Sequence, residues 1–282
     1  MSARIVIVLL LILALALVLR LRGITWGLPD DAHLFSYHPD EYFSLMAVWS
    51  FCFAGGDLNP HYFNYGTLYF YLVLIVAILA GHTDFDLQTV LDRGVSPPMR
   101  ALVLDGRLTT VVLAVLTVLF VFLAARRLFG VRAGLIGAFT LAIMPLHVVH
   151  GRFATVDVPM TFWIVVCLYC SACILAAWRP GVEADAGRGT AQSDLSAPRE
   201  RRRVLLLCAA AGGAAGLAAA TKYNGGLSLV FPVVAVLLGK ARLRGAQRTL
   251  RCCRCLAACA GAAALGFVLG CPYALAAPRE WW

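Results

Sequence analysis

Long apolar runs alternate with short polar loops along this chain, and the alternation predicts an all-α polytopic transmembrane helical bundle. Seven runs have the composition of membrane-spanning helices. An eighth apolar run, residues 65–81, is close to the lower length limit for a span and could either cross the membrane or lie at its surface. The seven predicted spans are residues 5–19, 108–125, 133–149, 158–178, 204–221, 226–239 and 255–271.

Two polar segments interrupt this pattern. Residues 23–106 form a long first loop rich in His, Tyr and Asp, and Glu41–Phe53 within it has the pattern of a short amphipathic helix lying on the membrane surface. Residues 179–203 are rich in Gly, Ala and charge, which predicts a disordered linker. The chain stops soon after its last apolar run, so we expect a single membrane module, residues 1–282, belonging to a longer protein.

Composition supports the membrane assignment. Hydrophobic residues make up 61% of the chain and charged residues 14%, whereas soluble domains average about 45–50% and about 25%. The net charge of +9 does not indicate a nucleic-acid partner, because the basic residues are concentrated in short loops between the apolar runs.

The loop charges predict which ends of the spans face the cytoplasm. Loops 126–132, 179–203 and 240–254 contain three, six and six Lys or Arg residues, but loops 150–157 and 222–225 contain one each. The three basic loops are therefore expected in the cytoplasm and the other two outside. We expect a multi-pass integral membrane protein, in the plasma membrane if the source is bacterial.

The position of Asp40 depends on whether residues 65–81 cross the membrane. If they do not cross, Asp40 lies outside, on the same face as Asp157. If they cross, Asp40 is cytoplasmic and the two carboxylates cannot meet. Arg20 and Arg22, which follow the first span, favour the crossing arrangement by their charge, whereas the chemistry below favours the other, and both stay open.

Asp40 and Glu41 are the first candidates for chemistry. Neighbouring residues lie about 100° apart around a helix, so they cannot form a symmetric acid–base pair. One would be a general base and the other a structural residue or metal ligand. A divalent cation held by these carboxylates with histidines is possible, although no metal-binding motif supports it.

A second group of candidates could bind an anion. Arg107, Arg152 and Lys222 all lie near the predicted external ends of spans. An arginine fork matches phosphate oxygens, but an arginine there could equally extend to lipid headgroups. Asp157 follows Arg152 in the same loop.

Several stretches together resemble the C-type (GT-C) membrane glycosyltransferases, which include protein O-mannosyltransferases, aminoarabinose transferases and Rgt-like bacterial enzymes. Their order and spacing cover most of the chain. Gly66 and Thr67 depart from the pattern, because this family commonly has prolines there and aminoarabinose transferases have a lysine just before. The matching stretches are residues 38–41 (HPDE), 64–69 (NYGTLY), 106–109 (GRLT), 126–130 (RRLFG), 144–145 (MP), 151–157 (GRFATVD) and 216–225 (GLAAATKYNG).

The resemblance implies a transferase that moves a sugar, with inversion, from a polyprenyl-phosphate donor to a protein, lipid or polysaccharide acceptor on the external face. It implies Asp40 as the catalytic base and Glu41 as the residue that orients the loop or ligates a cation. Arg107, Arg152 and Lys222 would then neutralise the donor phosphate, and Asp157 would hold an arginine or the acceptor.

Two rival functions remain. A transporter or flippase for lipid-linked sugars would have charged residues within its spans and broken helices near the membrane midplane, whereas these spans are nearly free of charge. A non-catalytic membrane scaffold would bind the lipid without turning it over.

Overall fold

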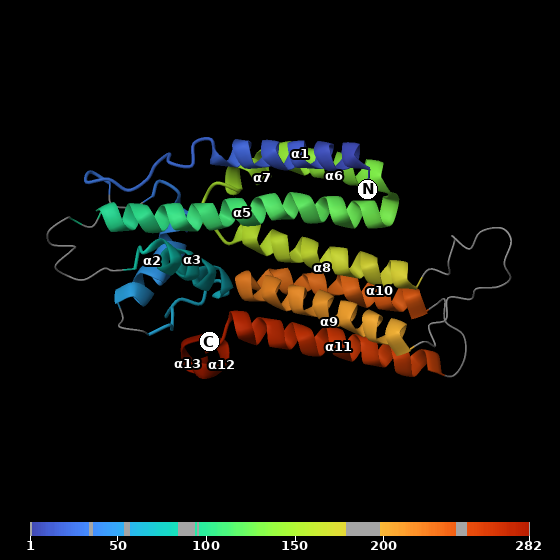
Figure 1. Cartoon of the computed structure of the whole chain (residues 1–282). Helices are drawn as coiled ribbons and strands as arrows, with labels where there is room; N and C mark the ends of the chain where they lie inside the picture. The colour runs from blue at the N-terminus through green and yellow to red at the C-terminus, as the bar shows by residue number, and fades with distance from the viewer. Residues whose placement is uncertain are drawn as a thin grey trace.

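The computed structural model describes residues 2–33, 36–53, 57–83, 94, 96–178, 198–240 and 247–281. The elements in this part of the chain are all helical, which confirms the predicted fold class. Figure 1 shows an elongated bundle with two short helices set beside one of its ends. The elements are α1 (Ala3–Leu21), α2 (Pro39–Phe53), α3 (Leu68–Ala80), α5 (Ser96–Phe129), α6 (Val131–Ile143), α7 (Pro145–His150), α8 (Asp157–Ala177), α9 (Pro198–Thr221), the 3₁₀ helix η1 (Tyr223–Leu229), α10 (Val230–Lys240), α11 (Gln247–Gly270), α12 (Tyr273–Ala276) and α13 (Pro278–Trp281).

Five helices in the described residues are long and apolar enough to cross a membrane: α1, α5, α8, α9 and α11. The other two predicted spans are not continuous α-helices. The predicted span 133–149 is divided between α6 and α7, and the span 226–239 begins in the 3₁₀ helix η1 before α10. Residues 198–203, expected in the disordered linker, form the start of α9, and the rest of that linker lies outside the described residues.

Arg20 stabilises the break between α6 and α7. Pro145 has no N–H, so it cannot donate to the carbonyl of Leu141 as a helical residue would. The buried guanidinium of Arg20 supplies this donor, with N–O distances of 3.4 Å to Leu141 and 3.2 Å to Ala142, and its Nη2 lies 2.7 Å from His147 Nδ1. The charge of Arg20 is therefore used inside the bundle and is not a signal of cytoplasmic sidedness.

Helix α3 does not cross the bundle. Its 13 residues extend about 20 Å, and the hydrocarbon core is about 30 Å thick. The 34 residues of α5 extend about 51 Å, so the N-terminal part of α5 reaches beyond the other spans, and α3 lies beside this part (Figure 1). The Tyr69 hydroxyl of α3 donates to the Gly106 carbonyl of α5 at 2.9 Å.

This arrangement supports the alternative in which residues 65–81 stay on one face. Asp40 on α2 and Asp157 at the start of α8 lie at the same end of the bundle, and the last turn of α5, with Arg126 and Arg127, lies at the opposite end.

Glycines allow α9 and α11 to pack closely. A Cβ atom at Gly212 would lie 2.1 Å from the Cys259 carbonyl oxygen, and one at Gly216 would lie 2.1 Å from the Ala263 carbonyl oxygen. These distances are below van der Waals contact, so any side chain would push the two helix backbones apart. A Cβ atom at the neighbouring Gly213 would lie 3.9 Å from the nearest atom of the other helix.

We therefore expect Gly212→Ala to destabilise the fold and Gly213→Ala to leave it nearly unchanged. Overpacking a tight contact costs about 1–3 kcal/mol. Thermal unfolding of the two purified variants in detergent measures the difference. Equal melting temperatures for both would contradict the close helix contact.

Candidate functional site

The candidate site is built on the first turn of α2. The helix begins at Pro39, whose fixed φ and missing N–H suit the first helical position, and Asp40 and Glu41 follow in the same turn. Carboxylates are favoured there because the helix N-terminus carries partial positive charge. The helix predicted from Glu41 to Phe53 is therefore present, and it begins two residues earlier, so that Asp40 is helical as well.

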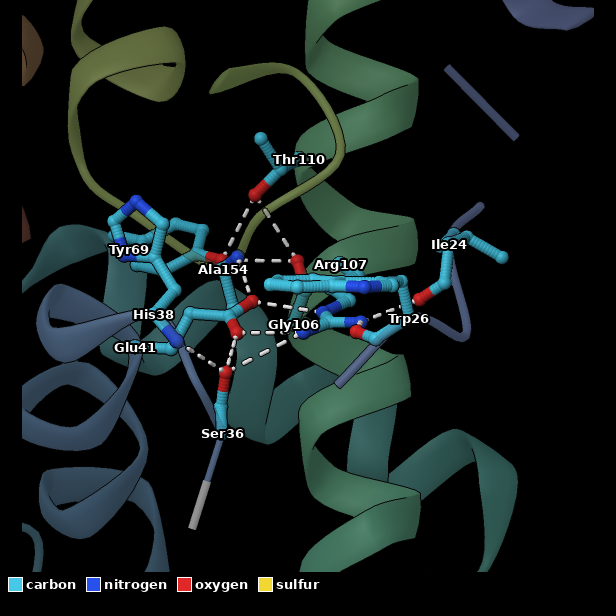
Figure 2. A network of polar contacts seen from close by, with 10 residues as sticks. All are labelled: Ile24, Trp26, Ser36, His38, Glu41, Tyr69, Gly106, Arg107, Thr110 and Ala154. Atoms are coloured by element: carbon cyan, nitrogen blue, oxygen red, sulfur yellow. Dashed lines mark hydrogen bonds and ion pairs between the residues drawn. The ribbon is translucent and has the colours of Figure 1, made fainter. Parts of the chain in front are cut away.

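Glu41 is fully buried and accepts four hydrogen bonds. Its two carboxylate oxygens lie 2.8 Å from Arg107 Nε and 2.7 Å from Arg107 Nη2. The Ala154 backbone N–H donates at 2.6 Å, and the Ser36 hydroxyl donates the fourth bond. Figure 2 shows the carboxylate enclosed by these groups, which come from α2, α5 and two loops.

All five N–H donors of Arg107 are used. Besides the Glu41 carboxylate and the Ser36 hydroxyl, its guanidinium donates to the carbonyl oxygens of Ile24 at 2.6 Å and Trp26 at 2.8 Å. An arginine has five such donors, and the side chain is 1% exposed. Arg107 therefore has no donor left for a phosphate, and Glu41 has its lone pairs committed to the protein.

The Glu41–Arg107 ion pair joins four separate segments: the chain after α1, the loop before α2, α5 and the loop before α8. A charge that is buried without its partner costs several kcal/mol, so these segments are held together. Ser36, Tyr69 and the Ala154 N–H belong to this network or border it (Figure 2). Tyr69 and Ala154 lie in stretches that resemble the family, but neither was singled out as a site residue, and Ser36 lies in none of those stretches.

Asp40 is left on the other side of the same helical turn. It is half-buried. Burial raises the pKa of Tyr62, and the charge of Asp40 adds to this increase. The Tyr62 ring stacks on Phe43 at 5.7 Å between centroids and lies 6.1 Å from the Tyr65 ring. An aromatic surface thus extends from Phe43, on the helix that carries Asp40, through Tyr62 to Tyr65.

Lys222 and Asp157 lie at the far end of this surface. Lys222 Nζ is 2.7 Å from Asp157 Oδ1 and 5.5 Å from the centre of the Tyr65 ring. The Tyr223 hydroxyl holds this loop in place, 2.8 Å from the Phe63 carbonyl and 3.0 Å from the Tyr65 carbonyl.

The Lys222–Asp157 pair differs in kind from the Glu41–Arg107 pair. The two side chains are 30% and 41% exposed, and exposed ion pairs contribute only about 0.2–1 kcal/mol. Lys222 can therefore exchange Asp157 for another anion at little cost, which Arg107 cannot do.

Arg152 lies elsewhere, beside Arg20. The Gly23 backbone packs near its guanidinium, and its buried Nε has no hydrogen-bond partner within the described residues. His38 lies between this region and Asp40, with its ring 4.5 Å from Phe153 and 6.3 Å from His150. The structure thus brings Asp157 and Lys222 into contact but shows no contact between Arg152 and either of them.

The described part of the chain contains no group of three or more His, Cys, Asp or Glu side chains that could hold a metal ion. His61 has both ring nitrogens engaged, with Nδ1 2.7 Å from Glu280 and Nε2 3.2 Å from Asp57. A divalent cation therefore stays a prediction, and Glu41 is not placed to ligate it.

Comparisons with known proteins confirm the resemblance at the level of the fold. The family model for dolichyl-phosphate-mannose-protein mannosyltransferase matches residues 103–181. No curated protein sequence matches the chain significantly.

Three solved structures illustrate the similarity. The Saccharomyces cerevisiae protein O-mannosyltransferase Pmt1–Pmt2 complex, bound to the sugar donor, matches with a TM-score of 0.66 at 15% identity, covering 100% of this chain and 34% of that one. ArnT from Cupriavidus metallidurans, bound to undecaprenyl phosphate, matches at 0.58 and 20%, covering 96% and 42%. The Archaeoglobus fulgidus oligosaccharyltransferase, tethered to an acceptor peptide, matches at 0.60 and 17%, covering 99% and 35%.

These proteins are membrane glycosyltransferases of the GT-C type, and the chain has the fold of the part that it matches. The chain spans about a third to two fifths of the length of these structures.

We expect Glu41→Gln to destabilise the protein strongly because it leaves the Arg107 charge buried without its counter-ion. The loss should be about 3–5 kcal/mol. Asp40→Asn, one residue away, is the matched control and should change stability by less than about 1 kcal/mol. Chemical unfolding in detergent compares the two, and a similar loss in both would argue against separate roles for these carboxylates.

The contact between His61 and Glu280 should weaken as pH rises. Hydrogen bonds with Asp57 and Glu280 raise the pKa of His61. A raised pKa means that the stabilisation is complete below about 6.5, the ordinary value, and is lost as pH rises through the folded-state value. The protection factors of the backbone amides of residues 279–281, which are corrected for the intrinsic pH dependence of exchange, should therefore fall from pH 6 to pH 8.5. His61→Gln should remove this pH effect, and an unchanged pH effect in that variant would exclude His61 as its source.

Proposed function

We propose that this chain is the membrane module of an inverting glycosyltransferase that uses a polyprenyl-phosphate sugar. In this proposal Asp40 is the general base that removes the proton from an acceptor hydroxyl as its oxygen attacks the anomeric carbon. The bond from that carbon to the phosphate oxygen breaks, and the polyprenyl phosphate leaves with the electron pair. Relatives of this fold have been solved with a sugar donor and with undecaprenyl phosphate.

The observation that carries the proposal is that two adjacent carboxylates in one helical turn have different surroundings. Glu41 is buried and bonded to four donors, whereas its neighbour Asp40 is not part of that network. A rigid turn of α2 that leaves one carboxylate available is the arrangement that a positioned general base requires. The aromatic side chains of Tyr62 and Tyr65 beside it offer flat surfaces for a sugar ring.

Lys222 is the donor-phosphate ligand that the geometry favours. It lies at the end of the aromatic surface, and its weak pair with Asp157 can open when a phosphate arrives. A cation at that point stabilises the negative charge that develops on the leaving phosphate. Asp157 would hold Lys222 in place before the donor binds.

The roles proposed for the two arginines differ. Arg107 acts as a positioning residue through Glu41, and we withdraw it as a phosphate ligand because its five donors are occupied. Arg152 remains a candidate for the lipid phosphate, supported by its charge interaction with Arg20 and by its buried Nε, which has no hydrogen-bond partner within the described residues.

The proposed site faces outside. It lies at the end of the bundle opposite Arg126 and Arg127, and the loop-charge rule puts those arginines in the cytoplasm. The acceptor would be a protein or a glycan.

Two features of the structure bear on the rival functions. The break between α6 and α7 and the buried Arg20 are features that a transporter could use. However, Arg20 closes that break with hydrogen bonds to Leu141 and Ala142, and this favours a fixed structural joint over a moving gate. A non-catalytic scaffold would have no need to bury Glu41 in a hydrogen-bond network while leaving Asp40 outside it.

The test is sugar transfer by the protein in liposomes, with dolichyl-phosphate [³H]mannose as donor and a membrane protein and glycan fraction as acceptors. We expect Asp40→Asn to reduce turnover by about 10²–10⁴-fold, the usual contribution of a general base, while binding of dolichyl phosphate stays within a few-fold. Asp31→Asn, an exposed carboxylate of the same loop, is the control and should retain activity.

Full activity of Asp40→Asn would remove Asp40 as the base. Binding of dolichyl phosphate by the wild-type protein, with no transfer to any acceptor, would instead support the scaffold. Movement of the intact labelled lipid between leaflets without its consumption would support the flippase.

A further inference from the structure

The end of the bundle opposite the candidate site carries two cavities that share an arginine. The first has a volume of about 360 Å³ and is lined by Leu123, Arg126, Arg127, Tyr169, Cys173 and Arg203. The second is an open hollow of about 490 Å³ on the surface of α9 alone, and it is lined by Arg199, Arg202, Arg203, Leu206, Leu207 and Ala210. Arg203 belongs to both.

Three packed helices build the first cavity. Arg126 and Arg127 come from the last turn of α5, Tyr169 from α8 and Arg203 from the start of α9, and α8 packs against both α5 and α9. In Figure 1 these helix ends lie away from α2 and α3. The cavity is therefore a product of helix packing and not of one charged helix end.

The charge of this cavity is strongly positive. Glu200 lies in the first turn of α9, and its Oε1 is 3.6 Å from Arg203 Nη1. Arg203 is 60% exposed, and an exposed pair of this kind is weak. Arg126, Arg127 and Arg203 line the same cavity, so their like charges repel, and an anion in the cavity would reduce that repulsion.

The lining of the second cavity changes from basic to apolar along α9. Its arginines lie in the first turns of α9, and Leu206, Leu207 and Ala210 follow one to two turns further into the membrane span. A basic end that passes into an apolar groove matches the shape of a phospholipid, with its headgroup on the arginines and an acyl chain along the leucines.

The first cavity is much larger than a neighbouring cavity. Trp178, Arg201, Arg251 and Arg254 line a cavity at the same end of only about 60 Å³, which has room for about two water molecules. The 360 Å³ cavity lies in the range of ligand sites, about 300–1,000 Å³.

We propose that the paired cavities bind a phospholipid whose headgroup carries net negative charge, with the phosphate between Arg127 and Arg203. The site lies at the opposite end of the bundle from the proposed sugar transfer, and it stands whether or not that function is correct. By the loop-charge rule it faces the cytoplasmic leaflet, where anionic lipids would supply the ligand.

The test is native mass spectrometry of the purified protein with phosphatidylglycerol, phosphatidylcholine and inorganic phosphate as separate probes. We expect phosphatidylglycerol to be retained well above phosphatidylcholine. Arg127→Gln/Arg203→Gln should weaken phosphatidylglycerol binding by about 10–30-fold, and Arg127→Lys/Arg203→Lys should keep most of it. Arg132→Gln removes an exposed charge outside both cavities and should bind as the wild type does.

Ala210→Trp gives an independent check, because it narrows the apolar cavity without changing any charge. It should weaken binding of long-chain phosphatidylglycerol and leave its dihexanoyl analogue unaffected. Equal retention of phosphatidylglycerol and phosphatidylcholine would overturn the proposal, and so would unchanged binding by the double Gln variant. Binding of inorganic phosphate as tight as that of the lipid would show a free-phosphate site instead.

Discussion

The buried ion pair between Glu41 and Arg107 is the contact on which the candidate site depends. Arg107 lies on α5, the longest helix in the described residues, and its donors are directed at Glu41 in the first turn of α2 and at Ile24, Trp26 and Ser36 in the chain between α1 and α2. Glu41 links the start of α2 to the same point and also to the Ala154 N–H before α8. Loops that would otherwise be independent are thus fixed to one rigid helix, and this allows a surface carboxylate such as Asp40 to keep a defined position.

The contrast between the two ion pairs explains how one site can be both rigid and responsive. The Glu41–Arg107 pair is 0–1% exposed, so breaking it would bury an uncompensated charge. The Lys222–Asp157 pair is partly exposed, and water screens it. The first pair therefore sets geometry, and the second can rearrange around a charged ligand. Both pairs consist of an acid and a base of ordinary type, and burial alone distinguishes them.

The two ends of the bundle use arginine for different purposes. Arg20, at the break between α6 and α7, and Arg107, at the candidate site, are buried and donate to backbone carbonyls, so both hold protein segments together. At the opposite end, Arg127 and Arg203 line an open cavity. A count of basic residues treats these as equal, although the charge of Arg20 is engaged inside the bundle.

The sequence by itself determined the fold class, because long apolar runs separated by basic loops have few other solutions. It also predicted a helix at Glu41–Phe53, and the structure extends this helix back to Pro39. The Asp40–Glu41 pair stood out as the chemical centre, and the roughly 100° between neighbours on a helix already required different roles for the two.

Only the tertiary structure decided which of the two carboxylates is buried. Whether Glu41 or Asp40 is buried depends on Arg107, 66 residues away along the chain, and no local pattern contains that contact. Similarly, the length of residues 65–81 left crossing and non-crossing equally open, until the hydrogen bond from Tyr69 to Gly106 placed α3 against the end of α5. A membrane span can be predicted from the hydrophobicity of its own residues. Which charged side chains form a pair depends on which distant segments pack together, and the local sequence does not contain that information.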